Sequence, residues 1–143
     1  MEDRELSCEE RVKDHLESRL EDLRELWENI RNNDLSDEER NGAFEDFNNY
    51  ALSFDYVSPG TFTDQDQGYF RYQISWGGPS DEFRFYVNPD LTAYKVEYWF
   101  LDWFDGAGRT LYNEDKALML EIYEDFRECG TCQYVYEKEM EDL

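Results

Sequence analysis

The sequence predicts an α+β domain: an antiparallel meander of three to four strands, with two N-terminal helices and one C-terminal helix packed on one face. Three observations predict it. Apolar residues alternate through the middle of the chain, which is the period of a strand. Two capping boxes precede stretches with helical spacing of apolar residues, and a third such stretch follows the strands. At 143 residues we expect one domain, divided into a helical hairpin (1–51), a sheet (52–112) and a C-terminal helix with tail (113–143).

The first helix is predicted over residues 7–32. Ser7 and Glu10 have the spacing of a capping box, in which each side chain accepts a hydrogen bond from a backbone N–H at the helix start. Apolar residues three and four apart follow, so they share one face. These inward-facing residues are Val12, Leu16, Leu20, Leu23, Trp27 and Ile30.

The second helix is predicted from Ser36 to about Tyr50. Ser36 and Glu39 form another capping box, and Leu35 stands where a hydrophobic staple would. The first two helices are then expected to form an antiparallel hairpin. The residues expected to pack are Ala43, Phe44, Phe47, Tyr50 and Ala51.

The sheet is predicted from alternation within residues 69–105. One run ends at Gly77–Ser80 and a second at Asn88–Asp90, both of which have turn composition. A third run, 94–104, is apolar on both faces, and residues 52–57 offer a further strand. The loop 61–68 has acidic spacing that resembles the start of a calcium loop, but the later ligands are missing, so we expect a simple loop.

The C-terminal part is predicted as turn, helix and edge strand. Asp105–Gly108 is expected to be a turn, followed by a short strand at 109–112. Asn113 is expected to cap a third helix that ends near Glu128, before Gly130. Residues 131–136 are expected to add an edge strand, and residues 137–143 an acidic tail. The residues expected to face inward from the third helix are Leu118, Met119, Ile122, Tyr123 and Phe126.

The charge balance excludes several kinds of partner. The chain has 36 acidic and 14 basic residues, a net charge of −22. Such a surface repels nucleic acid and anionic membranes and attracts basic proteins. The chain has no run of about 18 apolar residues, and its first residues lack the features of a signal peptide, so we expect a cytoplasmic protein.

Acidic residues form stripes on two predicted helices, and no basic residue of the same helix falls inside either arc. A helix rise of about 1.5 Å spaces the first stripe at roughly 5.4 Å per charge, against about 3.4 Å per phosphate along one DNA strand. The stripes are therefore candidates for partner binding by imitation of phosphates, although a solvated face is the ordinary interpretation. The first stripe is Glu10, Asp14, Glu17, Glu21, Glu25 and Glu28, and the second is Glu114, Glu121, Glu124, Asp125 and Glu128.

The first helix also permits a coiled-coil homodimer. Its core positions would alternate as a and d of a heptad, but they include a charged residue, Arg19, and span only about three heptads. These positions are Val12, Leu16, Arg19, Leu23, Leu26 and Ile30.

The residue types needed for metal binding or redox chemistry are few. His15 is the one histidine and has no predicted partner. Cys129 and Cys132 form a CxxC, but the expected position after a helix lacks the N-terminal dipole that activates redox pairs. Zinc would need two more ligands, and only Cys8 and His15 remain. We therefore expect no metal and no cofactor.

No pattern indicates catalysis. The acidic residues Asp81, Glu82, Asp102 and Asp105 could supply a carboxylate pair, but in so acidic a chain such pairs arise by chance. Gly77-Gly78 lacks the residues of a phosphate-binding loop, and no nucleophile motif occurs. We expect that the protein is not an enzyme.

The rings of the last strand have two interpretations. Tyr94, Tyr98, Trp99 and Trp103 would suggest stacking on nucleic acid in a basic protein, but the acidic surroundings oppose it. Core packing is expected for most of them. Some could instead anchor a protein partner, because Trp and Tyr dominate the energetics of interfaces.

The segment 52–111, with FDYVSPGTF, GYFRYQ, GGPSDEFRFYVNPD and VEYWFLDWFDGA, resembles small acidic proteins carried by bacterial phages and other mobile elements. The resemblance implies an anti-restriction or anti-CRISPR factor, several of which imitate DNA with surface carboxylates. It implies no site residue.

Three hypotheses follow. The first is inhibition of a nucleic-acid-binding defence protein, a CRISPR effector or restriction enzyme, by acidic mimicry. The second is an acidic immunity or antitoxin protein that blocks a basic toxin. The third, a housekeeping protein of a salt-adapted host, predicts acidity spread evenly over the surface.

Overall fold

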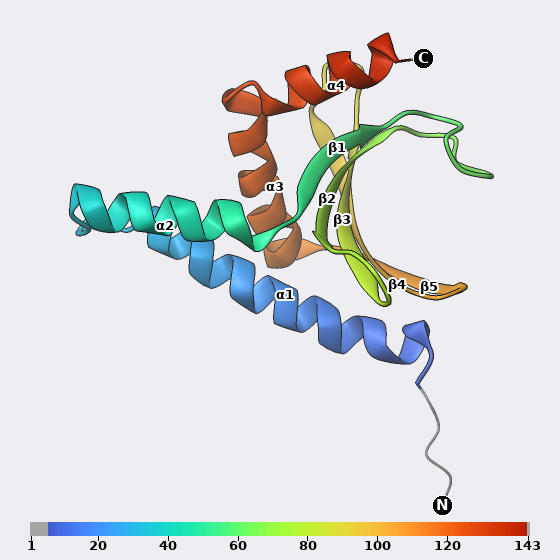
Figure 1. Cartoon of the computed structure of the whole chain (residues 1–143), viewed down its shortest axis with the longest axis horizontal. Coiled ribbons are helices and arrows are strands. Elements are labelled where there is room, and N and C mark those ends of the chain that lie inside the picture. Colours follow the sequence, from blue (N-terminus) through green and yellow to red (C-terminus); the bar gives the residue numbers. More distant parts are fainter. Residues whose placement is uncertain (1–5, 143) are drawn as a thin grey trace, which may run out of the picture.

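The fold is α+β, as expected, and residues 6–142 contain four helices and a five-stranded antiparallel sheet (Figure 1). The computed structural model describes residues 6–142, so the last residue of the predicted tail, Leu143, lies outside the described part. The helices all lie on one side of the curved sheet, and its other face is open (Figure 1).

The sheet is a simple meander. The strands lie in the order β1-β2-β3-β4-β5, each antiparallel to its neighbours, so the predicted three- to four-stranded meander is confirmed in kind and extended to five strands. The alternation that predicted it decides the faces, because Phe70 pairs with Phe85 and Phe85 with Val96 in one buried row. The strands are β1 (Ser53–Val57), β2 (Tyr69–Ser75), β3 (Ser80–Val87), β4 (Ala93–Asp102) and β5 (Asp105–Thr110).

The two N-terminal helices begin as predicted. Ser7 accepts a hydrogen bond from the N–H of Glu10, Ser36 accepts one from the N–H of Glu39, and both capping boxes are complete. The helices form a hairpin in which Trp27 lies against Phe47, with ring centroids 5.5 Å apart. The helices are α1 (Cys8–Ile30), α2 (Asp37–Tyr50), α3 (Asn113–Glu128) and α4 (Thr131–Glu141).

The core is built largely from aromatic rings. Phe54 of β1 stacks on Phe126 of α3 at 4.4 Å and on Phe70 at 5.5 Å, and Tyr123 stacks on Phe85 at 5.0 Å. Sheet and helices therefore share one core. One expected packing residue differs: Phe44 of α2 is exposed, whereas Phe47 of the same helix packs against Trp27 of α1.

The predicted turn at Asp105–Gly108 is wrong, because these residues begin β5. The turn lies two residues earlier, at Trp103 and Phe104, which connect the register partners Asp102 and Asp105. Gly106 and Gly108 belong to a strand because the side chains of Leu101 and Trp99, on the neighbouring strand, lie across them. A Cβ added to Gly108 would lie 2.5 Å from a ring atom of Trp99.

The predicted edge strand at residues 131–136 is also wrong, since these residues begin α4. Cys132, Val135 and Tyr136 have helical spacing and face the core, where Tyr136 meets the ring of Tyr56 at 4.9 Å. The predicted cap of α3 differs too. Asn113 has a φ of 54°, and the N-cap position belongs to Tyr112, which makes no side-chain cap bond.

The coiled-coil alternative for α1 is wrong. Its proposed core positions are already used inside the domain, where Val12 and Leu23 are buried and Arg19 bonds to Asp81 of β3. No helix within residues 6–142 is long and apolar enough to cross a membrane.

Candidate acidic partner-binding face

The acidic stripe of α1 is fully on the surface. Its apolar face is buried against the sheet, α2 and α3, so the opposite face turns outward, and all six stripe residues are exposed. Glu10 is occupied by the capping box with Ser7. The other five make no side-chain hydrogen bond or ion pair with any residue in 6–142. We call these five, Asp14, Glu17, Glu21, Glu25 and Glu28, the α1 row.

The acidic stripe of α3 is partly neutralised. Glu121 accepts hydrogen bonds from Trp27 Nε1 at 3.1 Å and Arg31 Nη1 at 2.8 Å, both from the N-terminal part of the chain. Glu124 pairs with Arg127 at 3.0 Å. Neither arc contains a cation of its own helix, so both cations come from outside these arcs. Arg127 is three residues from Glu124 on the same helix, whereas Arg31 is 90 residues from Glu121, a contact that helical spacing could not reveal.

The two stripes meet along a groove between α1 and α3. Arg24 and Arg31 lie in it, and Arg24 reaches Asp115 at 3.4 Å. The groove does not include Glu10 and Asp14, which stand toward the N-terminal end of α1. Its acidic lining is Glu17, Glu21, Glu25 and Glu28 from α1 and Glu114, Asp115, Glu121, Glu124, Asp125 and Glu128 from α3.

The net charge lies mainly on the helices. The four helices contain 22 acidic and 8 basic residues, whereas the five strands contain 6 and 4. The acidic character therefore belongs to the helical side of the molecule, where the α1 row lies.

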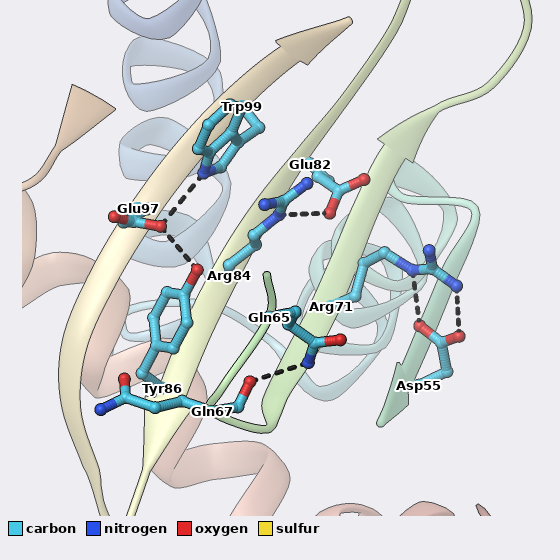
Figure 2. Close-up of polar contacts among 9 residues, drawn as sticks. All are labelled: Asp55, Gln65, Gln67, Arg71, Glu82, Arg84, Tyr86, Glu97 and Trp99. Carbon is cyan, nitrogen blue, oxygen red and sulfur yellow. Dashed lines mark hydrogen bonds and ion pairs between the residues drawn. The ribbon is translucent and has the colours of Figure 1, made fainter. Parts of the chain in front are cut away.

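The open face of the sheet is close to neutral, because its acids and bases pair with one another (Figure 2). Arg71 makes two hydrogen bonds with Asp55, at 3.1 and 2.7 Å, and Arg84 donates to Glu82 at 2.8 Å. Glu97 accepts from Tyr86 at 2.7 Å and Trp99 at 3.1 Å.

Arg84 is held between two rings on this open face. Its guanidinium lies 4.5 Å from the ring centroid of Trp99 and 5.0 Å from that of Tyr69. Burial raises the pKa of the Tyr86 hydroxyl, and its hydrogen bond to Glu97 raises it further. The cations of this face are therefore paired within the sheet, and among residues 6–142 the face presents no free basic patch for nucleic acid.

The candidate carboxylates of the sheet each bond to a different group, although Asp102 and Asp105 are register partners across the β4–β5 turn. Asp81 faces the helices and accepts from Arg19, while its neighbour Glu82 faces the other side and pairs with Arg84. Asp102 pairs with Arg11 at 2.5 Å, and Asp105 accepts from the backbone N–H of Cys8 at 2.8 Å. That backbone hydrogen bond is the main cause of the lowered pKa of Asp105.

The remaining candidate ligands are also dispersed. His15 stacks on Phe100, with ring centroids 4.2 Å apart. Cys129 is exposed and Cys132 is buried at the start of α4, where burial raises the pKa of the Cys132 thiol to about 11. A helix therefore does begin at the CxxC, contrary to expectation, but the shift disfavours the thiolate. No group of three metal-ligating side chains occurs among residues 6–142.

The rings of the last strand divide between the two interpretations. Tyr98 is completely buried and Trp99 lies flat over Gly108, so both belong to the packing of the sheet. Trp103 is exposed at the β4–β5 turn. The sequence placed Trp103 inside a strand, and the only signal against that placement was the acidic residue on each side of Trp103 and Phe104.

Comparisons of the chain with protein-family models, with curated proteins and with solved structures find no match.

Proposed function

We propose that the protein inhibits a nucleic-acid-binding defence protein, such as a CRISPR effector or restriction enzyme, by placing the α1 row in its nucleic-acid-binding surface. One observation carries the proposal: five exposed carboxylates follow one line on a long helix, and none has a partner within residues 6–142.

The absence of partners matters because acids of the sheet are paired. Asp55, Asp81 and Asp102 all bond to arginines of the domain. A row of like charges on one helix face destabilises the fold, since neighbours at i and i+4 repel each other. A basic partner would remove that repulsion on binding. The carboxylates of the row are therefore charged and unpaired, as recognition by lysines and arginines requires.

The α3 side of the groove contributes less than its sequence suggests. Glu121 and Glu124 are paired with Arg31 and Arg127, whereas Glu114, Asp125 and Glu128 make no such bond among the described residues. The mimic we propose is thus the α1 row with these three α3 carboxylates beside it. Arg24 and Arg31 lie between the two helices.

Binding of this kind competes directly with nucleic acid. Complementary charge speeds association, and added salt slows it because ions screen exposed charges. A bound partner would present its lysines and arginines to the carboxylates instead of to phosphates. Duplex DNA should then displace the inhibitor, and the inhibitor should displace DNA.

The test compares charge reversal on α1 with an equal reversal elsewhere. The variant Glu17→Lys, Glu21→Lys, Glu25→Lys changes the α1 row. The control variant Glu38→Lys, Glu45→Lys, Asp46→Lys changes three exposed acids of α2. Each triple change takes the net charge from −22 to −16. Tagged proteins are incubated with lysate of the source cells at low salt and at about 0.5 M salt, where charge is screened.

We expect the wild type and the α2 control to retain a basic nucleic-acid-binding protein that duplex DNA displaces. The α1 variant should bind the purified partner roughly 100-fold more weakly. Equal losses from both triple variants would mean that only net charge matters and would contradict the proposed site. A retained small toxin that DNA does not displace would point to the immunity function instead.

A further inference from the structure

Three large rings are exposed at one end of the sheet, where two hairpin turns lie side by side (Figure 1). Trp76 belongs to the β2–β3 turn, and Trp103 and Phe104 form the β4–β5 turn. Trp76 is 74% exposed, Trp103 is 84% exposed, and Phe104 is fully exposed. We call these three residues the aromatic tip.

The two turns are in close contact. A Cβ added to Gly78 would lie 3.9 Å from Trp103 Nε1. Trp103 therefore lies against the turn that contains Trp76, and exposed apolar surface gathered at one end of a soluble protein marks an interaction site.

The backbone conformation of Trp103 is unfavourable for a bulky, exposed residue. Its φ is 54°, in the left-handed region that glycine favours and bulky residues avoid. Leu91 has a similar φ of 68°, but its side chain is buried, so packing offsets the cost. The Trp103 ring, 84% exposed, gains no such packing against residues 6–142. A costly, exposed aromatic residue at a glycine position indicates a role outside the fold.

Polar contacts of the β4–β5 hairpin connect the aromatic tip to the start of α1. Asp105 accepts a hydrogen bond from the Cys8 N–H at 2.8 Å, and Asp102 pairs with Arg11 at 2.5 Å. Arg109 pairs with Glu9 at 2.6 Å. The residues on either side of the Trp103–Phe104 turn thus hold the N-terminal end of α1, just before the α1 row begins at Asp14.

We propose that the aromatic tip docks into an apolar pocket, bordered by lysines or arginines, on the same basic protein that binds the α1 row. This inference rests on the proposed function. Charge complementarity selects this occupant, because a net charge of −22 repels an anionic membrane and a second copy of the chain. Continuity with the α1 row places both contacts on one partner.

The two contacts have different kinetic roles. Exposed carboxylates chiefly accelerate association, whereas buried tryptophan and phenylalanine anchors chiefly slow dissociation. Loss of the tip should therefore leave the association rate nearly unchanged and shorten the lifetime of the complex.

The test uses Trp103→Gly in the full chain, because glycine accepts the φ of this turn whereas alanine would keep the strain. The matched control is Tyr134→Ala, which removes an exposed ring from α4, away from the tip. Thermal unfolding is measured for each variant. Association and dissociation rates are measured with the purified basic protein that the wild type retains from lysate.

We expect Trp103→Gly to unfold at the same or a higher temperature, to dissociate at least about tenfold faster, and to associate within about twofold of the wild-type rate. Tyr134→Ala should match the wild type in both rates. A photo-crosslinking phenylalanine analogue at position 104 should link to that basic protein and not to another copy of this chain.

An unchanged dissociation rate for Trp103→Gly would overturn the inference, and the charge-reversal variant of α1 would still decide the proposed function separately. A fall in unfolding temperature would show that the ring supports the fold and would also overturn it. So would crosslinking at position 104 to a second copy, or binding of the wild type to neutral phosphatidylcholine vesicles that Trp103→Gly abolishes. If lysate yields no basic protein for the wild type, both proposals fail together.

Discussion

At the scale of single residues, Asp81 shows how this acidic chain uses a carboxylate for stability. It is 1% exposed on the helical side of β3. It accepts hydrogen bonds from Arg19 at 2.7 Å, from Ser75 at 2.5 Å and from Tyr98 at 2.6 Å. One side chain thus connects α1 with three strands. Burial raises the pKa of Tyr98, and its bond to Asp81 adds to the effect, so this hydroxyl remains a donor.

Asp81→Asn should therefore destabilise the protein by about 3 kcal/mol, because it leaves the half-buried Arg19 guanidinium without its charged partner. Urea unfolding followed by circular dichroism measures this loss. Glu45→Gln, which removes an exposed acid of α2, should change the free energy of unfolding by less than about 0.5 kcal/mol. A comparable loss in both variants would contradict the structural role of Asp81.

At the scale of elements, α1 determines where the acidic row is presented. Its capping box sets the first residue of the helix, and its buried apolar face sets the rotation about the helix axis. Since the same residue spacing governs both faces, burial of Val12, Leu23 and Ile30 turns the row toward solvent. The position of the helix start also sets the contacts with Asp102 and Asp105 of the β4–β5 hairpin.

Ser7→Ala should cost about 1 kcal/mol of unfolding free energy, because the N–H of Glu10 loses its acceptor at the helix start. Chemical denaturation provides the measurement. Ser18→Ala is the matched control, since this exposed serine stands in the middle of α1, where alanine is the better helix former. Equal destabilisation by the two changes would show that the cap is not the cause.

At the scale of the whole molecule, charge is segregated. The helices have a net charge of −14, from 22 acidic and 8 basic residues, and the strands a net charge of −2. A protein adapted only to salt would be expected to spread its acids evenly. Here the open sheet face is internally paired, and the unpaired row follows one helix, which favours a specific basic partner.

Because the acidic residues of the helices repel one another, we expect sodium chloride to stabilise the fold. The screening length falls from about 10 Å at 0.1 M to about 3 Å at 1 M salt, so repulsion along the α1 row weakens. Differential scanning calorimetry should show a rising unfolding temperature over this range. The rise should be smaller for the triple lysine variant of α1, and a flat or falling profile in the wild type would argue against repulsion.

The sequence by itself determined the features that depend on local chemistry and spacing. Alternation around Phe70 and Phe85 predicted the strands and their faces, and the serine–glutamate pairs predicted where α1 and α2 begin. The exposure of the α1 row followed from helical spacing alone, because the opposite face of the same helix is apolar.

The tertiary structure decided what depends on neighbours distant in the chain. Gly106 and Gly108 have the composition of a turn, but in the fold the side chains of Leu101 and Trp99 lie across them and they belong to β5. Residues 131–136 form a helix because helical spacing lets them pack against β1. Likewise, Arg31 neutralises Glu121 only where α1 meets α3, and Trp103 is exposed only because the chain turns there. Local spacing contains no information on such contacts, since they form between residues up to about 100 positions apart.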